Sequence, residues 1–320
     1  FGSSFGSTMQ QGQRPAQHME EADHRQRVLT KEQVRQFRAD GFLLVPGLFS
    51  AKEVSLLSRI AKWKEPKANI WLKDLLSRRD QGNGTSSIYD AIYHDRRVIE
   101  PMAELLGDEL SAFNYKMIMK QKSILDRRRV EGGSGNHWAW HQDFGYWYHF
   151  HPRFISPDMG NCFIAIDRAH RSNGCLKVLR GSHKLGRLDH GTVGEVDGRA
   201  AFVDKPGPPP QASREDGQYG ADPRRVEQAI ECGHELVHIE MEPGSALFFH
   251  GNLLHSSQEN LSDDPRWVFI CCYNVKTNTG GDGHPLFRPV KPWPNGSLAK
   301  LGEAQLATLK AKVQLAPSKL

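Results

Sequence analysis

The sequence predicts a mainly β protein with flanking helices, and three observations carry this prediction. From about residue 112 onward, short runs rich in β-branched and aromatic residues are separated by glycine, proline and asparagine, a spacing typical of an antiparallel barrel or sandwich. Before that point, signals for helix starts dominate. The chain has 320 residues, of which 38% are hydrophobic and 25% charged, and this is enough to bury one sizeable core. We therefore expect a single domain over residues 26–320.

The amino-terminal part of this domain, about residues 29–111, is predicted to be largely helical. Thr30 with Gln33 and Ser50 with Glu53 match the Ser/Thr-x-x-Glu/Gln pattern that caps helix starts. Between these two helices, GFLLVPGLF predicts a short buried strand and a turn. Farther along, VIEPMAELLGDEL predicts another helix that ends near its glycine.

The core, about residues 112–276, is predicted from five runs with strand character. They are FNYKMIM, CFIAIDR, CLKVLRGSH, HIEMEPGSALFFH and RWVFICCYNV. Two polar segments, residues 126–136 and 203–223, interrupt these runs, and we predict that they are long loops that act as lids. Residues 277–320 form a carboxy-terminal extension, and the Gly/Ser/Gln-rich residues 1–25 form a tail, either native or left from cloning.

The composition excludes several classes of function. No apolar run is long enough for a membrane span, and the start lacks the pattern of a secretion signal. The net charge of +5 is modest and its lysines and arginines are mixed with acids, so we expect no nucleic-acid partner. The cysteines number five, an odd count without a disulfide framework, which suits a reducing compartment. The final Ser318, Lys319 and Leu320 match an address read by the peroxisomal import receptor; we expect a peroxisomal location in a eukaryote and a cytoplasmic one otherwise.

The segment WAWHQDFGYWYHF, residues 138–150, contains the first candidate site. His141 and Asp143 are separated by one residue, so on the core strand expected here both side chains leave the same face and converge on one ion, while Gln142 faces away. A third ligand must come from elsewhere, and His255 is the best candidate, with His250 as its rival. Two histidines and one carboxylate are typical of non-haem iron(II) sites, which keep positions open for a co-substrate and dioxygen.

Arg266 follows His255 by eleven residues and begins the strand RWVFICCY. Strand alternation places its side chain on the same face as Val268, Ile270 and Cys272. An inward guanidinium beside a metal requires an anion, and the distal carboxylate of 2-oxoglutarate would supply one. Ser257 lies on the same face as His255 and could donate its hydroxyl to that carboxylate.

Three ordered segments resemble the motifs of the phytanoyl-CoA hydroxylase family, also called the phytanoyl-CoA dioxygenase family, of iron(II)/2-oxoglutarate dioxygenases. They are HQD, NGCLKVLRGSHK and FFHGNLLHSSQENLSDDPRW, and the segment LTKEQVRQFRADGFLLVPGLFSAKEV is similar to the amino-terminal opening of that family. The resemblance runs from about residue 29 to 275. It implies a double-stranded β-helix, which is a distorted, cupin-like jelly roll flanked by helices, and an enzyme that hydroxylates an unactivated carbon.

The resemblance also assigns site residues. It implies that His141, Asp143 and His255 are the catalytic iron(II) ligands. It further implies that 2-oxoglutarate is held by four residues, namely Arg266, Ser257, Lys116 and Phe163. Dioxygen is the third reactant. Because Asp143 is present, where the halogenating branch has glycine or alanine, we expect hydroxylation rather than halogenation.

The substrate stays open at this point. Phe144 and Trp147 match the HxDFxxW pattern of ectoine hydroxylase, and aromatic rings beside a metal would suit a small zwitterion or a secondary metabolite. However, Ile118 fills the place where such enzymes have asparagine, so their substrate contacts do not transfer. Arg127, Arg128 and Arg129 form either a solvated loop or a grip for an anionic substrate. Together with the terminal Ser318, Lys319 and Leu320 and the family name, they favour an acyl-CoA or lipid-derived carboxylate. An alternative of another class is a metal-binding β-barrel without catalytic activity.

Overall fold

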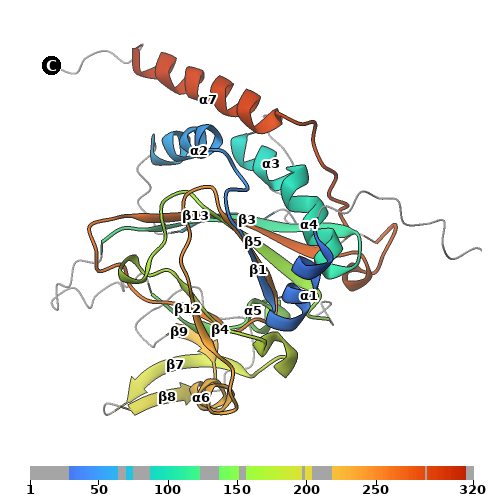
Figure 1. Cartoon of the computed structure of the whole chain (residues 1–320), viewed down its shortest axis with the longest axis vertical. Helices are drawn as coiled ribbons and strands as arrows, with labels where there is room; N and C mark the ends of the chain where they lie inside the picture. The colour runs from blue at the N-terminus through green and yellow to red at the C-terminus, as the bar shows by residue number, and fades with distance from the viewer. Residues whose placement is uncertain are drawn as a thin grey trace, which may run out of the picture.

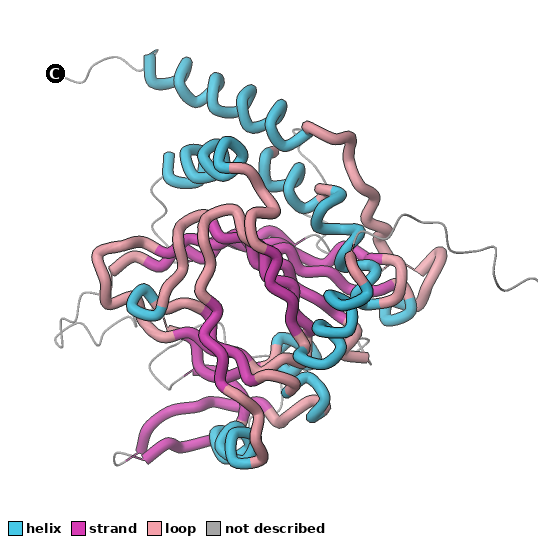
Figure 2. The backbone as a smooth tube through the Cα atoms, viewed as in Figure 1, coloured by secondary structure: helices cyan, strands magenta, loops and turns pink. Residues whose placement is uncertain are grey.

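Two antiparallel sheets face each other across the interior of the protein (Figures 1 and 2). The computed structural model describes residues 29–63, 70–74, 87–122, 137–150, 156–196, 199–203, 218–284 and 287–314. Apolar side chains from both sheets, including Phe113 and Phe163 from the larger sheet and Val178 and Ile239 from the smaller one, pack into one cluster between them. The site lies in this interior.

The strand order confirms the predicted double-stranded β-helix. The larger sheet runs β1 (Phe42–Val45), β11 (Ala246–His250), β5 (Met159–Ala165), β13 (Arg266–Val275), β3 (Leu110–Lys120) and β2 (Ile70–Asp74). The smaller sheet runs β10 (Leu236–Ile239), β6 (Leu176–Leu179), β12 (His255–Ser257) and β4 (Trp138–His141). Every pairing in both sheets is antiparallel, and the chain alternates between the sheets from β3 to β6 and again from β10 to β13. This alternation distinguishes a jelly roll from a meander.

Helices cover the outer face of the larger sheet (Figure 1). They are α1 (Lys31–Asp40), α2 (Ala51–Trp63), α3 (Ile88–Tyr93) and α4 (Arg96–Leu106), and α7 (Ser297–Gln314) packs on α2 and α3. The two predicted capping boxes are confirmed: Thr30 and Gln33 bond reciprocally before α1, and Ser50 and Glu53 do so before α2. Gly107 ends α4 in the left-handed conformation that glycine adopts without strain. Short 3₁₀ turns complete the chain at Arg171–Asn173, Ser182–Leu185 and Thr277–Thr279.

Successive side chains of strand β13 point alternately toward the helical layer and toward the interior between the sheets. Cys271 packs in the cluster under the helices, whereas its neighbour Cys272 packs in the cluster between the sheets. Val268 and Ile270 share the inner face with Cys272, as predicted. Arg266 begins the same strand and lies opposite Lys120 on β3. The alternation therefore directs the Arg266 guanidinium into the interior.

The prediction that residues 138–150 form one core strand is wrong. Strand β4 ends at His141, and Asp143 begins the helix α5 (Asp143–Phe150). The Tyr146 amide donates to the Gln142 carbonyl oxygen across the first turn. Phe144 and Trp147, three residues apart, are buried on one face, while Tyr148 is exposed. The aromatic residues thus follow the helical period rather than the period of two that a strand requires.

A third sheet, also missed, lies mostly before the polar segment 203–223 and includes only Val203 and residues 218–221 of it. It consists of β8 (Arg199–Val203), β7 (His190–Val196) and β9 (Gln218–Ala221), and it is followed by α6 (Pro223–Glu231). Only four residues of β9 pair with β7, and so short a strand leaves little pattern in the sequence. Residues 204–217 of the predicted lid lie outside the described residues.

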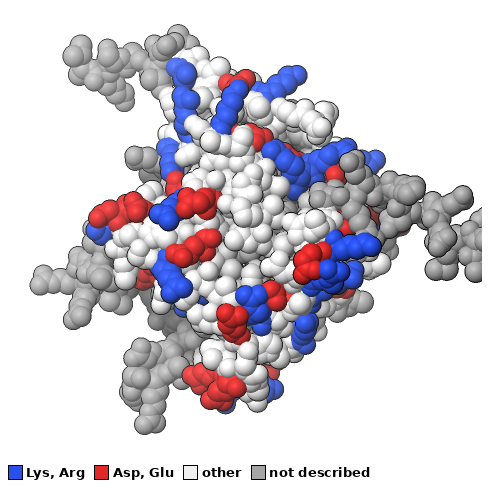
Figure 3. All heavy atoms as spheres, in the orientation of Figure 1, with Lys and Arg blue, Asp and Glu red and all other residues white. Residues whose placement is uncertain are grey.

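Several other predictions also fall outside the described residues. They concern the tail at 1–25, the loop at 126–136 and the terminal Ser318, Lys319 and Leu320. Within the part of the chain that the structure describes, no helix is both long and apolar enough to cross a membrane. On the face drawn in Figure 3, basic and acidic side chains are interspersed, and the absence of a nucleic-acid partner stays a prediction.

Candidate metal centre and co-substrate pocket

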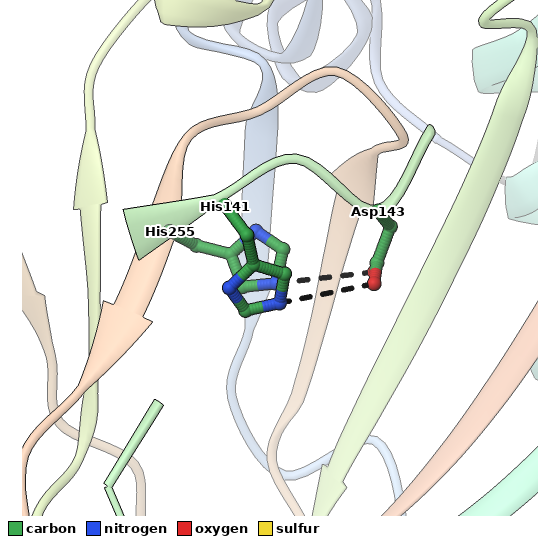
Figure 4. A group of neighbouring side chains, drawn as sticks. All are labelled: His141, Asp143 and His255. Atoms are coloured by element: carbon green, nitrogen blue, oxygen red, sulfur yellow. Dashed lines mark ion pairs between the residues drawn. The ribbon is translucent and has the colours of Figure 1, made fainter. Parts of the chain in front are cut away.

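The pairing of β4 with β12 brings two of the predicted ligands together. His141 and His255 are direct partners across these strands, and their ring centres lie 4.1 Å apart. Asp143 reaches the same point from the start of α5. Its Oδ1 lies 4.0 Å from His141 Nε2 and its Oδ2 lies 3.9 Å from His255 Nε2 (Figure 4). The turn after β4 therefore brings Asp143 next to the histidines, whereas the sequence predicted that strand alternation would do so.

The hydrogen bonds of both histidines leave one ring nitrogen available for a metal. His141 Nδ1 donates to the Ala139 carbonyl oxygen at 2.8 Å, and His255 Nδ1 donates to the Leu253 carbonyl oxygen at 2.9 Å. Because Nδ1 carries the proton in each ring, the lone pair resides on Nε2, which faces Asp143. Burial lowers the pKa of both residues, that of His255 to about 3. Both imidazoles therefore stay neutral and able to bind a metal.

Asp143 is kept ionised and oriented by two neighbours. Burial alone would raise its pKa, but the positive charge of the Lys116 ammonium holds the pKa below its ordinary value. Asn161 Nδ2 donates to Asp143 Oδ2 at 2.7 Å. Asn161 was missed in the sequence, where the only signal is a polar residue inside the apolar run of β5. The carboxylate is thus fixed at one oxygen and open at the other.

These three side chains fit a non-haem iron(II) centre. Among the described residues, they form the one group of histidine, cysteine or acidic ligands whose donor atoms lie within 4.8 Å of one another. Two neutral nitrogens and one carboxylate suit iron(II) and leave the remaining positions open. The rival His250 is not part of this group, and its Nδ1 accepts a hydrogen bond from the Asn252 amide. Gln142 also points elsewhere, toward Gly186 and Asn252.

One cavity connects the three ligands to Arg266. It contains about 470 Å³ of space that no protein atom fills, and part of this space is open solvent. Lys116 and Phe163 line it, as the resemblance implied, and so does Ser257. The other lining residues are Ile118, Trp138, Leu176 and Ser256. All the predicted co-substrate residues therefore lie on the wall of one cavity.

Arg266 is a buried cation without a carboxylate partner. Arg266 is only 3% exposed, and its Nε has no hydrogen-bond partner among the described residues. Burial lowers its pKa to about 10, so the guanidinium remains charged at neutral pH. A buried and unpaired charge is costly unless a ligand neutralises it. This end of the cavity is therefore suited to bind an anion.

The predicted substrate residues are placed differently. Phe144 and Trp147 are buried in the cluster between the sheets, and neither belongs to the described residues that line the cavity. Trp147 instead supports Lys116, whose Nζ lies 5.7 Å from the centre of its ring. Trp138 is the aromatic residue of this segment that lines the cavity. Arg127, Arg128 and Arg129 lie outside the described residues, so the substrate roles of all five residues stay predictions.

Comparison with known proteins places the chain in a family. The family model for phytanoyl-CoA dioxygenase (PhyH) matches residues 37–268. An ectoine dioxygenase from Bordetella bronchiseptica is 26% identical over 262 residues, which cover 78% of this chain and 77% of the relative. An L-proline trans-4-hydroxylase from Streptomyces griseoviridis is 30% identical over 196 residues, which cover 58% of this chain and 62% of the relative.

Solved structures support the fold. The EctD of S. alaskensis with bound Fe superposes with a TM-score of 0.56 at 19% identity, covering 86% of this chain and 85% of that one. The same protein with 2-oxoglutarate and 5-hydroxyectoine gives a TM-score of 0.55 at 18% identity, covering 83% and 86%. At these identities the likeness concerns the fold.

Proposed function

Because the chain belongs to the phytanoyl-CoA dioxygenase family, we propose that it hydroxylates a small organic substrate in the cavity between its two sheets. The protein is an iron(II)- and 2-oxoglutarate-dependent dioxygenase. The main observation behind the proposal is that one cavity contains both a site for a cation and a site for an anion. The triad of His141, Asp143 and His255 at one end requires a cation, and the buried Arg266 at the other end requires an anion.

The chain's own residues would divide the work as follows. His141, Asp143 and His255 would hold iron(II), while Arg266 and Ser257 would bind the distal carboxylate of 2-oxoglutarate. Together, the metal and the co-substrate supply the activation of dioxygen that hydroxylation of an unactivated carbon requires. The positive charge of Lys116, near Asp143, would attract the negatively charged oxo-acid end of the co-substrate, which lies nearest the metal. Phe163 and the other apolar lining residues would exclude bulk water, which strengthens every charge interaction in the cavity.

Two features support a small substrate. The one cavity that joins the three metal ligands to Arg266 must hold the co-substrate and the substrate together. The named relatives are an ectoine dioxygenase and an L-proline hydroxylase, and both names refer to small polar molecules. An acyl-CoA or lipid-derived carboxylate remains the alternative, and it rests on Arg127, Arg128 and Arg129. The peroxisomal address at Ser318, Lys319 and Leu320 likewise stays a prediction.

Anaerobic addition of iron(II) and 2-oxoglutarate tests the chemistry first. We expect a visible charge-transfer absorption band that requires both components, and its absence would favour a metal-binding barrel without catalytic activity. The Arg266→Met variant should need a far higher 2-oxoglutarate concentration to develop the same band.

A substrate screen then tests the proposed class. Succinate release would be measured in air with ectoine, L-proline, other amino acids and a set of acyl-CoAs. We expect a small polar compound to stimulate release. Stimulation by acyl-CoAs alone would reject the small substrate while leaving the dioxygenase assignment intact.

A further inference from the structure

Lys120 lies beside Arg266 at the distal end of the cavity, and no part of the function described so far uses it. It is the last residue of β3 and the direct partner of Arg266 on β13. The residue is fully buried, at 0% exposure. Its Nζ donates to Ser257 Oγ at 2.7 Å and to the Gln258 carbonyl oxygen. It thus contacts the serine that is expected to bind the co-substrate.

The charges around Lys120 are unbalanced. Neither Lys120 nor Arg266 forms an ion pair with any carboxylate in the described part of the chain. Burial, and after it the charge of Arg266, lowers the pKa of Lys120 to about 6. Cys175 and Glu259 act in the opposite direction, and Lys177 adds to the lowering. Near neutral pH, most Lys120 side chains in the ligand-free protein are therefore neutral amines.

The protonation state of Lys120 determines whether the Ser257 hydroxyl can donate a hydrogen bond into the cavity. A neutral amine can accept the hydroxyl hydrogen of Ser257, which turns that hydrogen away from the cavity. An ammonium can only donate, so it donates to Ser257 Oγ and leaves the hydroxyl hydrogen free for another acceptor. A carboxylate bound at Arg266 would be such an acceptor. It would also supply the negative charge that two adjacent buried cations lack.

We propose that Lys120 is a positioning residue of the co-substrate subsite that takes up one proton from solvent when the distal carboxylate of 2-oxoglutarate binds. The new ammonium then holds Ser257 with its hydroxyl hydrogen directed at that carboxylate. This inference rests on the proposed use of 2-oxoglutarate at Arg266.

Coupling to a proton gives the affinity a definite pH dependence. Above about pH 6, the ligand-free protein must gain a proton in order to bind, so the Kd for 2-oxoglutarate should rise with pH by up to about tenfold per unit. The neighbouring groups do not titrate between pH 7 and 8.5, because the pKa of Arg266 is about 10 and that of Cys175 about 11. Lys120 is thus the group at this end of the cavity that responds in that range.

Calorimetry of 2-oxoglutarate binding tests the proposal without any substrate. The full chain would be saturated with Mn(II) in place of iron(II) and titrated at pH 7.5 in two buffers that differ in heat of ionisation. We expect uptake of close to one proton and a Kd that rises about three- to tenfold from pH 7 to 8. Binding with no buffer-dependent heat and a flat Kd would overturn the role of Lys120, whereas no binding at all would count against the proposed function itself.

Variants separate Lys120 from other sources of protons. Lys120→Met should lose the uptake and the pH dependence and should weaken binding several-fold at pH 7. Lys122→Met is the matched control, because Lys122 lies two residues farther along, is half exposed and pairs with Asp263; it should behave as the wild type. Equal proton uptake by Lys120→Met and the wild type would assign the proton elsewhere. If Lys120→Met does not fold, the wild-type calorimetry alone decides.

Discussion

The two ends of the cavity balance their charges in opposite ways. At the metal end, Asp143 lies between two neutral histidines and is further held by Asn161 and by the charge of Lys116. At the distal end, Arg266 lies beside Lys120, and neither cation forms an ion pair with a carboxylate of the described residues. The metal end thus places a cation, Lys116, near its carboxylate, whereas the distal end keeps a buried charge without a carboxylate partner among the described residues.

This difference shows how the cavity can orient its ligand. A preformed set of donors binds a metal without rearrangement, since the histidine tautomers are already fixed by backbone carbonyls. An unpaired buried cation instead gains most when an anion arrives. A molecule with a metal-binding oxo-acid at one end and a carboxylate at the other satisfies both ends in one orientation only.

The largest effect is expected from removal of Asp143. Asp143→Ala deletes the one anionic ligand and leaves Lys116 without its compensating charge, so iron(II) binding should fall below detection and substrate-dependent succinate formation should stop. Metal content after dialysis and succinate release measure this. Asp263→Ala is a control, because the Asp263 side chain is 90% exposed. Full turnover by Asp143→Ala would reject the ligand assignment and with it the contrast between the two ends.

The sequence predicted the identity of these groups better than their setting. His141, Asp143, His255 and Arg266 were identified from motif spacing, which can be recognised without knowing the local secondary structure. The strand expected around Asp143 was wrong because consecutive aromatic residues satisfy a helix as well as a strand. Asn161 and Lys120 could not be recognised because their partners come from distant strands, and a polar residue inside a strand does not indicate what it contacts.

The second largest effect is expected at the distal end. Arg266→Met removes the charge that binds the distal carboxylate, and loss of one partner of a buried charged pair costs about 2–5 kcal/mol. The Kd for 2-oxoglutarate should rise by roughly 30-fold or more, while the Kd for Mn(II) changes little. Calorimetry measures both.

The same variant should make the ligand-free protein more stable to urea, because an unpaired buried guanidinium is replaced by an apolar side chain. A variant that is less stable and binds 2-oxoglutarate normally would show that Arg266 has a structural partner rather than a ligand. The comparison of the two ends would then fail at the distal end.

A smaller effect on metal binding is expected from removal of the side chain that orients Asp143. Asn161→Ala removes the hydrogen bond to Asp143 Oδ2, and loss of such a supporting contact weakens metal binding by about 10- to 100-fold. Competition with a chelator measures the Mn(II) affinity, and the exposed Asn295→Ala serves as the control. Unchanged affinity would mean that Asp143 is oriented by the turn after β4 alone.

The smallest effect concerns the stability of the ligand-free protein. The folded pKa of Lys120 is about 6, below its ordinary value of 10.5, so between these values the unfolded chain binds more protons than the folded one. The free energy of unfolding should therefore rise with pH in this window, by about 1 kcal/mol per unit from Lys120 itself. Urea unfolding at pH 7 and pH 8 isolates this contribution, since the gain between the two pH values should be larger in the wild type and in Lys122→Met than in Lys120→Met. Equal gains in all three proteins would mean that Lys120 is already charged, and the distal end would then carry two cations even before its ligand binds.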